Sequence, residues 1–175
     1  FLDSEVRHLE IFCDSCCGQN KNYTMFRYLN YVVTETTRLD TIKMTFPIRG
    51  HSYLECDRDM ALINQKCKAE VPEDWIEEIK NARQKPTAFQ VVEVDQGVIR
   101  NWPGFRSTKF VNNCPFPSRP IREMIVSSEH SRVIKHRSTY NGYWETSVIR
   151  PHGFIQQAAY RSGEFFLPEK LHKGK

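Results

Sequence analysis

The feature that most constrains the fold is a strand-like segment that ends in an aspartate and leads through a polar turn into a helix. In residues 8–14, HLEIFCD, apolar and polar residues alternate with the period of a β-strand. The alternation puts Leu9, Ile11 and Cys13 on one face, which we expect to join the core. Asp14 then stands at the carboxyl end of the strand, directly before the turn SCCGQNKN.

The first half of the chain continues with a pattern typical of an α/β fold. Helical spacing of apolar residues predicts a helix over residues 20–36, and alternation over residues 41–48 predicts a second strand. Two more helices are predicted over residues 57–70 and from Pro72 onward, each with acidic residues in its first turn. Residues 1–85 therefore indicate strand-helix-strand-helix-helix, and we expect a parallel strand pair with a right-handed crossover.

The second half of the chain differs in pattern and in charge. Short strand candidates occur at residues 88–95, 123–128 and 131–137, separated by loops rich in Pro, Gly and Asn. Residues 86–175 are therefore predicted to form a small, basic, β-rich extension or subdomain. They carry 13 Lys and Arg against 7 Asp and Glu, whereas residues 1–85 carry 12 against 14. Such a basic half can face nucleic acid, although an ordinary solvated surface has the same composition.

Composition narrows the class of protein and its compartment. A hydrophobic share of 39% and an aromatic share of 12% exclude a disordered chain. No apolar run approaches the roughly 18 residues that a membrane helix requires, so we expect a soluble protein without a membrane partner. Three of the six cysteines, Cys13, Cys16 and Cys17, are clustered, and no secretory signal is recognised, which favours reduced thiols inside the cell.

Three acidic residues are candidates for a metal site. Asp14 ends the first predicted strand, and Asp57 and Asp59 follow the second strand, 43 and 45 residues later. The carboxyl ends of parallel strands meet at one edge of a sheet, where α/β proteins bind their ligands. Carboxylates that converge there suit Mg²⁺ or Mn²⁺, which activate water or a hydroxyl group in phosphoryl transfer. The alternative is that Asp14 caps the turn or the following helix.

Cysteine and histidine offer two other kinds of site. A tetrahedral zinc site would take its ligands from Cys13, Cys16, His51, Cys56 and Cys67. Cys13 lies on the apolar face of its strand and there is no second CxxC, so buried or incidental thiols are the favoured interpretation. A nucleophilic site that pairs Cys16 or Cys17 with His51 would also need an orienting group and an oxyanion hole.

Several polar and basic residues are candidates for contacts with nucleic acid. The turn before the first helix offers backbone N–H groups and amide donors that suit a phosphate group, and ordinary helix capping is the alternative. These turn residues are Gln19, Asn20, Lys21 and Asn22. The basic and aromatic residues predicted to contact DNA elsewhere are Arg49, Arg100, Trp102, Arg106, Lys109, Arg119 and Arg122.

Two phrases, IFCDSCCGQNKN and FPIRGHSYLECDRDMALI, together resemble a domain of unassigned function that is widespread in insect and other invertebrate genomes and derives from mobile elements. The resemblance covers about residues 8–80. That family is similar to the RNase H-like core of DDE transposases and integrases. By match to its motifs, Asp14 would be the second metal-binding carboxylate and Asp57 the third. Asp59 is the alternative third ligand, and His51 would be an accessory ligand or a phosphate contact.

The resemblance implies a fragment of a nuclease domain that acts on DNA phosphodiesters with Mg²⁺ or Mn²⁺ in the nucleus. The first acidic residue of the site would lie upstream of this chain, so the chain is expected to be inactive alone. The sequence departs from the family pattern at Ser15, Cys17 and Met60. The competing interpretation is a non-catalytic module, domesticated from a mobile element, that binds nucleic acid or protein. Assembly into a homo-oligomer is compatible with either.

Overall fold

The computed structural model describes residues 2–48, 54–66, 68–96, 104 and 109–151. The chain forms two compact units. The first combines Phe1–Ser52 with Arg100–Lys175, and the second is Tyr53–Ile99. None of the helices in the described ranges is long and apolar enough to cross a membrane.

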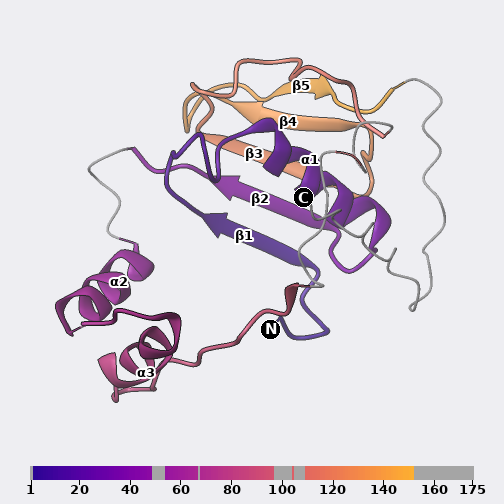
Figure 1. Ribbon diagram of the computed structural model, residues 1–175. Coiled ribbons are helices and arrows are strands. Elements are labelled where there is room, and N and C mark those ends of the chain that lie inside the picture. The colour runs from indigo at the N-terminus through magenta and orange to yellow at the C-terminus, as the bar shows by residue number, and fades with distance from the viewer. Residues whose placement is uncertain (1, 49–53, 67, 97–103, 105–108, 152–175) are drawn as a thin grey trace, which may run out of the picture. The chain divides into compact units, whose positions relative to one another are not determined.

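The first unit is built on a five-stranded mixed sheet (Figure 1). Its strands are β1 (His8–Phe12), β2 (Thr41–Thr45), β3 (Glu123–Ser127), β4 (Val133–Arg137) and β5 (Glu145–Val148), and they lie in that order. β1 and β2 are parallel, as predicted, and every other neighbouring pair is antiparallel. The second half of the chain therefore extends the sheet that begins in the first half.

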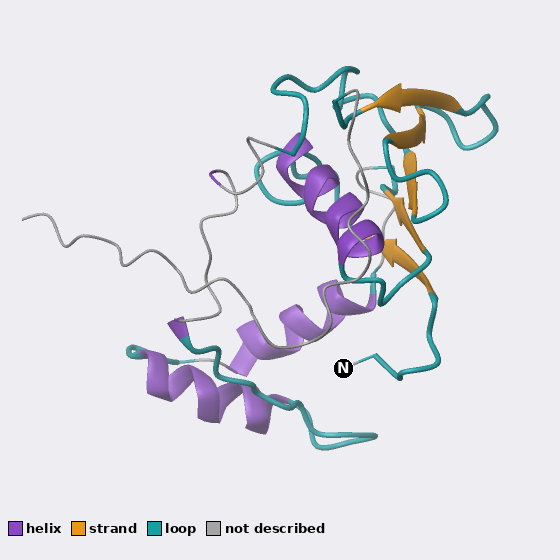
Figure 2. Cartoon of the chain, turned by 90° about the vertical axis from the view of Figure 1, so that its right-hand side faces the viewer, coloured by secondary structure: helices purple, strands orange, loops and turns teal. Residues whose placement is uncertain are grey.

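Helix α1 (Tyr23–Glu35) connects the two parallel strands and lies along one face of the sheet (Figure 2). Its buried side chains include Phe26, Leu29 and Val33, in agreement with the predicted apolar stripe. Burial of each such side chain contributes about 2 kcal/mol to folding. The facing side chains of the sheet and its flanking loops complete the core, and they include Ile42, Met44, Phe46, Phe116, Met124, Val126 and Ile134.

The second unit contains α2 (Glu55–Lys66) and α3 (Pro72–Ala82), both expected from the sequence. Proline begins α3, and the carboxylate of Asp74 accepts hydrogen bonds from the backbone N–H groups of Glu70 and Val71 at 3.1 and 3.2 Å. The described core of this unit is small, because its buried apolar residues are Ile63 and Ala82.

The prediction of a strand at residues 88–95 is wrong. This segment has no ladder partner in the described structure, and Val92 and Val94 are 63% and 66% exposed. Alternation predicts which residues share a face, but a strand also needs a neighbour to pair with its backbone. Conversely, β5 was not predicted, because its four residues, ETSV, have no strong apolar alternation.

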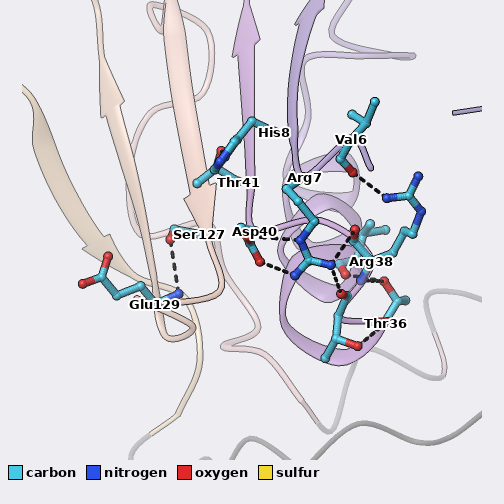
Figure 3. A network of polar contacts seen from close by, with 11 residues as sticks. Val6, Arg7, His8, Thr36, Arg38, Asp40, Thr41, Ser127 and Glu129 are labelled. Atoms are coloured by element: carbon cyan, nitrogen blue, oxygen red, sulfur yellow. Dashed lines mark hydrogen bonds and ion pairs between the residues drawn. The ribbon is translucent and has the colours of Figure 1, made fainter. Parts of the chain in front are cut away.

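A polar network joins the amino ends of β1 and β2 (Figure 3). The Arg7 guanidinium donates to both carboxylate oxygens of Asp40 at 3.1 and 2.6 Å and to the Thr37 carbonyl at 3.1 Å. Arg38 donates to the carbonyl of Val6. These bonds tie the segment before β1 to the loop between α1 and β2, so they help to set the register of the parallel pair.

Candidate functional site

The turn between β1 and α1, residues 13–22, lies at the carboxyl end of the parallel strand pair. Asp14 is exposed two residues after the end of β1, close to the position predicted from the alternation. One of its carboxylate oxygens, Oδ1, accepts a hydrogen bond from Asn20 Nδ2 at 2.8 Å and one from the Cys16 backbone N–H at 3.3 Å. Asp14 therefore stabilises the turn, as a capping role for this residue predicts.

The rest of the turn is held together by its own backbone. The Cys16 carbonyl accepts from the N–H groups of Gln19, Asn20 and Lys21 at 3.2, 2.9 and 3.0 Å. Asn22 is the N-cap of α1, because its side-chain oxygen accepts from the Met25 N–H at 2.9 Å. The amide groups that the sequence offered as phosphate donors are thus used largely inside the turn.

Lys21 lies at the end of the turn and is buried, with only 2% of its surface exposed. Its Nζ lies 5.0 Å from the centroid of the Phe46 ring. Burial is the main cause that lowers the pKa of Lys21, and the positive charge of Arg122 lowers it further. A second turn residue, Ser15, has a buried Oγ that forms no hydrogen bond with any described residue.

The cysteines do not form a metal site in the described part of the chain. Cys13 packs against the core as its strand phase predicted, and burial together with the charge of Asp14 raises its pKa to about 11. Cys16, Cys17 and Cys56 are free thiols. Within the described ranges no three His, Cys, Asp or Glu side chains are grouped to hold a metal ion. Cys67 and His51 lie outside those ranges.

The two candidate carboxylates of α2 differ in their surroundings. Asp59 Oδ1 forms an ion pair with Arg83 at 2.8 Å, and the Arg83 guanidinium lies 4.0 Å from the Phe89 ring centroid. Asp57 is exposed in the first turn of α2, and no described residue forms a hydrogen bond or ion pair with its carboxylate. Asp57 is therefore the carboxylate available to a ligand, whereas Asp59 stabilises its own unit. Asp14 belongs to the other unit.

The residues predicted to contact DNA differ in burial and in ion pairing. Lys109 pairs with Glu35 and lies 5.9 Å from the Tyr31 ring centroid, so its charge is already partnered. Arg122 is half-buried just before β3. Arg119 is exposed in the loop before it. Arg49, Arg100, Trp102 and Arg106 lie outside the described residues.

Sequence reasoning missed a surface on the face of the sheet. Ile125, Lys135, Trp144 and Thr146 line a hollow of about 340 Å³. The Arg137 guanidinium lies 4.5 Å from the Trp144 ring centroid. The sequence indication of this surface is the pair of aromatic residues in NGYWET. These residues can be placed on the sheet only if the following segment is recognised as a strand, and β5 was not predicted.

The fold and the turn define a mixed-sheet α/β protein with a polar turn at the carboxyl end of its parallel strands. The chain belongs to the DUF7869 family, described as a domain of unknown function, whose family model matches residues 6–105. The matched region contains every element from β1 to α3, and with them the turn and the candidate carboxylates Asp57 and Asp59. No curated protein and no solved structure matches the chain.

Proposed function

We propose that this chain is part of an RNase H-like, DDE-type nuclease or polynucleotidyl transferase that acts on DNA phosphodiesters. The observation that carries the proposal is the position of Asp14, exposed at the carboxyl end of β1 in a parallel β1–α1–β2 unit. This edge is where α/β sheets bind ligands. The resemblance of the two sequence phrases supplies the reaction class, and a nuclear site of action follows from a DNA substrate.

In this proposal, Asp14 would be one ligand of Mg²⁺ or Mn²⁺, and the resemblance makes Asp57 the candidate for another ligand. The donor type fits, because carboxylate oxygens are the ligands that these ions prefer. The described residues do not complete the site, since no group of three candidate ligands occurs among them. A further carboxylate, together with His51, would come from outside those residues. The bound ion would supply activation of water or of a 3′ hydroxyl group.

A second candidate function is binding of single-stranded nucleic acid without catalysis. It is favoured by the sheet face around Trp144, where an aromatic ring lies beside Arg137 and shares a hollow with Lys135. Aromatic rings that stack on bases, flanked by cations that contact phosphates, are typical of such surfaces. This binding would be sensitive to salt and independent of divalent ions.

The nuclease proposal predicts nicking of supercoiled plasmid by the parent protein in Mg²⁺ or Mn²⁺. Asp14→Asn and Asp57→Asn should each lower the nicking rate at least about a hundredfold, because loss of one carboxylate weakens metal binding. Glu129→Gln is the matched control, since Glu129 is an exposed acid of the same unit as Asp14. Asp59→Asn should instead lower stability through the lost Arg83 pair.

Wild-type nicking by the Asp14→Asn variant would overturn the assignment of Asp14. DNA-binding titrations with and without Mg²⁺ separate the two candidate functions. If the DNA affinity is the same with and without Mg²⁺, and the parent protein does not nick DNA, the non-catalytic module is favoured.

A further inference from the structure

Two cations at the carboxyl end of β1 and β2 have no counter-charge in the described structure. Lys21 is 2% exposed, and its ammonium contacts the Phe46 ring but forms no hydrogen bond or ion pair with any described residue. The Arg122 guanidinium likewise has no hydrogen bond or ion pair from the described chain. The buried Arg150 pairs with a carboxylate, as do the half-buried Lys43, Lys109 and Arg137. The half-buried Arg27 and Arg38 instead donate hydrogen bonds to backbone carbonyls.

The two cations lie at the same place in the fold. The Cys13 N–H donates to the Thr45 carbonyl at 3.1 Å, and the Phe46 N–H donates to the Arg122 carbonyl at 2.8 Å. The ends of β1 and β2 therefore meet the start of β3 at this edge. Lys21 reaches the same edge, because its ammonium lies over the Phe46 ring.

This arrangement is unfavourable in the absence of a ligand. Lys21 keeps only 2% of its surface exposed, so its ammonium has little contact with water, and one aromatic ring offsets only part of the lost hydration. The charge of Arg122 adds repulsion, as its lowering effect on the pKa of Lys21 shows. The buried hydroxyl of Ser15, which has no hydrogen-bond partner in the described part of the chain, belongs to the same turn. An anion with several oxygen acceptors would satisfy groups of this kind.

We propose that Lys21 and Arg122 bind a phosphate group at the carboxyl end of β1 and β2. An ammonium acts as a compact positive charge and a guanidinium as a planar fork of donors, and the combination suits the charge and oxygens of phosphate. The phosphate can belong to a DNA phosphodiester or be a free phosphate. Binding needs no metal ion, so the inference stands apart from the proposed nuclease activity.

The test measures binding by the full 175-residue chain in EDTA, using isothermal titration calorimetry. One arm uses inorganic phosphate, and the other uses a short oligodeoxynucleotide with hydroxyl groups at both ends. Lys21→Met and Arg122→Gln should each weaken binding about tenfold or more, as expected for the loss of a charge-assisted hydrogen bond. Lys80→Met is the control, because Lys80 is exposed on α3 and its loss removes the same charge.

Weakened binding of the oligonucleotide alone would assign the site to phosphodiesters, and weakened binding of inorganic phosphate would assign it to free phosphate. Equal losses in Lys21→Met and Lys80→Met would overturn the proposal, since they would reflect only net charge. Wild-type affinity of Lys21→Met for both ligands would also overturn it. Circular dichroism checks folding. If Lys21→Met does not fold, Arg122→Gln decides, because it keeps the backbone bonds of residue 122.

Discussion

At the scale of single residues, His136 shows how burial makes stability depend on pH. Its side chain is 3% exposed, its Nε2 lies 2.9 Å from Ser147 Oγ, and its ring centroid is 4.1 Å from that of Phe116. Burial is the main cause that lowers its pKa, and the charge of Glu145 partly opposes this. The folded protein therefore keeps His136 neutral at a pH where the unfolded chain already binds a proton.

The free energy of unfolding should consequently fall as the pH drops below about 6.5, the ordinary histidine pKa, towards the lower pKa of folded His136. Urea unfolding at pH 7.5, 6.5 and 5.5 measures this loss. His136→Gln should flatten the dependence, and His130→Gln, which changes an exposed histidine, should leave it as in the wild type. A wild-type slope in His136→Gln would contradict the prediction.

The positions of Cys13 and Asp14 could be predicted from the sequence, whereas the burial of Lys21 could not. Strand alternation depends on local geometry, so the sequence was enough to place one of these side chains in the core and the other at the exposed end. Lysine is almost never fully buried, and local pattern gives no reason to expect an exception. Its burial follows from the meeting of β1, β2 and β3, which only the folded chain brings about.

At the scale of elements, helix α1 is fixed to the loops around the sheet by a buried ionic cluster. Arg150 is 0% exposed and donates to Asn30 Oδ1, Glu35 Oε1 and Thr34 Oγ1 at 2.8, 2.9 and 2.7 Å. Glu35 also pairs with Lys109. One carboxylate at the end of α1 therefore balances two cations from distant parts of the sequence.

Glu35→Gln should lower the free energy of unfolding by about 3 kcal/mol, because it leaves the Arg150 charge buried without an ionic partner. Chemical denaturation measures the change, and Glu129→Gln provides the comparison at an exposed acid. If the double variant Glu35→Gln, Arg150→Met regains stability, the unpaired charge of Arg150 is the cause of the loss in the single variant. A loss no larger than that of Glu129→Gln would refute it.

Among the elements that the described residues form, periodicity located α1, α2 and α3 and four of the five strands, together with the parallel β1–β2 pair. It failed where tertiary pairing decides the outcome. Residues 88–95 alternate like a strand but have no described partner, whereas β5 is short and exists because β4 pairs with it. For the same reason the hollow beside Trp144 could not be foreseen.

At the scale of the whole molecule, the two compact units differ in how much apolar surface they bury. The sheet unit contains an extensive core around Phe26, Ile42 and Met124. The described part of the unit Tyr53–Ile99 buries Ile63 and Ala82, and it leaves Met60 and Trp75 52% and 41% exposed. A unit with few buried contacts opens locally at low free-energy cost.

Native-state hydrogen exchange should therefore show lower protection for the backbone amides of α2 and α3 than for those of α1, β2 and β3. We expect the slowest amides of the sheet unit to exchange only by global unfolding. Measurement by NMR or mass spectrometry on the full chain checks this order. Equal protection in both units would show that the unit Tyr53–Ile99 gains stability from contacts outside the described structure.

The hydrogen bond from the Phe46 N–H to the Arg122 carbonyl has a consequence for how sequences of this kind can change over evolution. The chain leaves the sheet after β2 and returns to it at β3. This hydrogen bond directly joins the residue at which the chain leaves to the residue at which it returns. The entropy of closing a flexible loop grows only with the logarithm of its length, so doubling the length costs about 0.6 kcal/mol. Insertions and deletions within the unit Tyr53–Ile99 would therefore be tolerated by the sheet, which leaves this unit free to diversify on a constant framework.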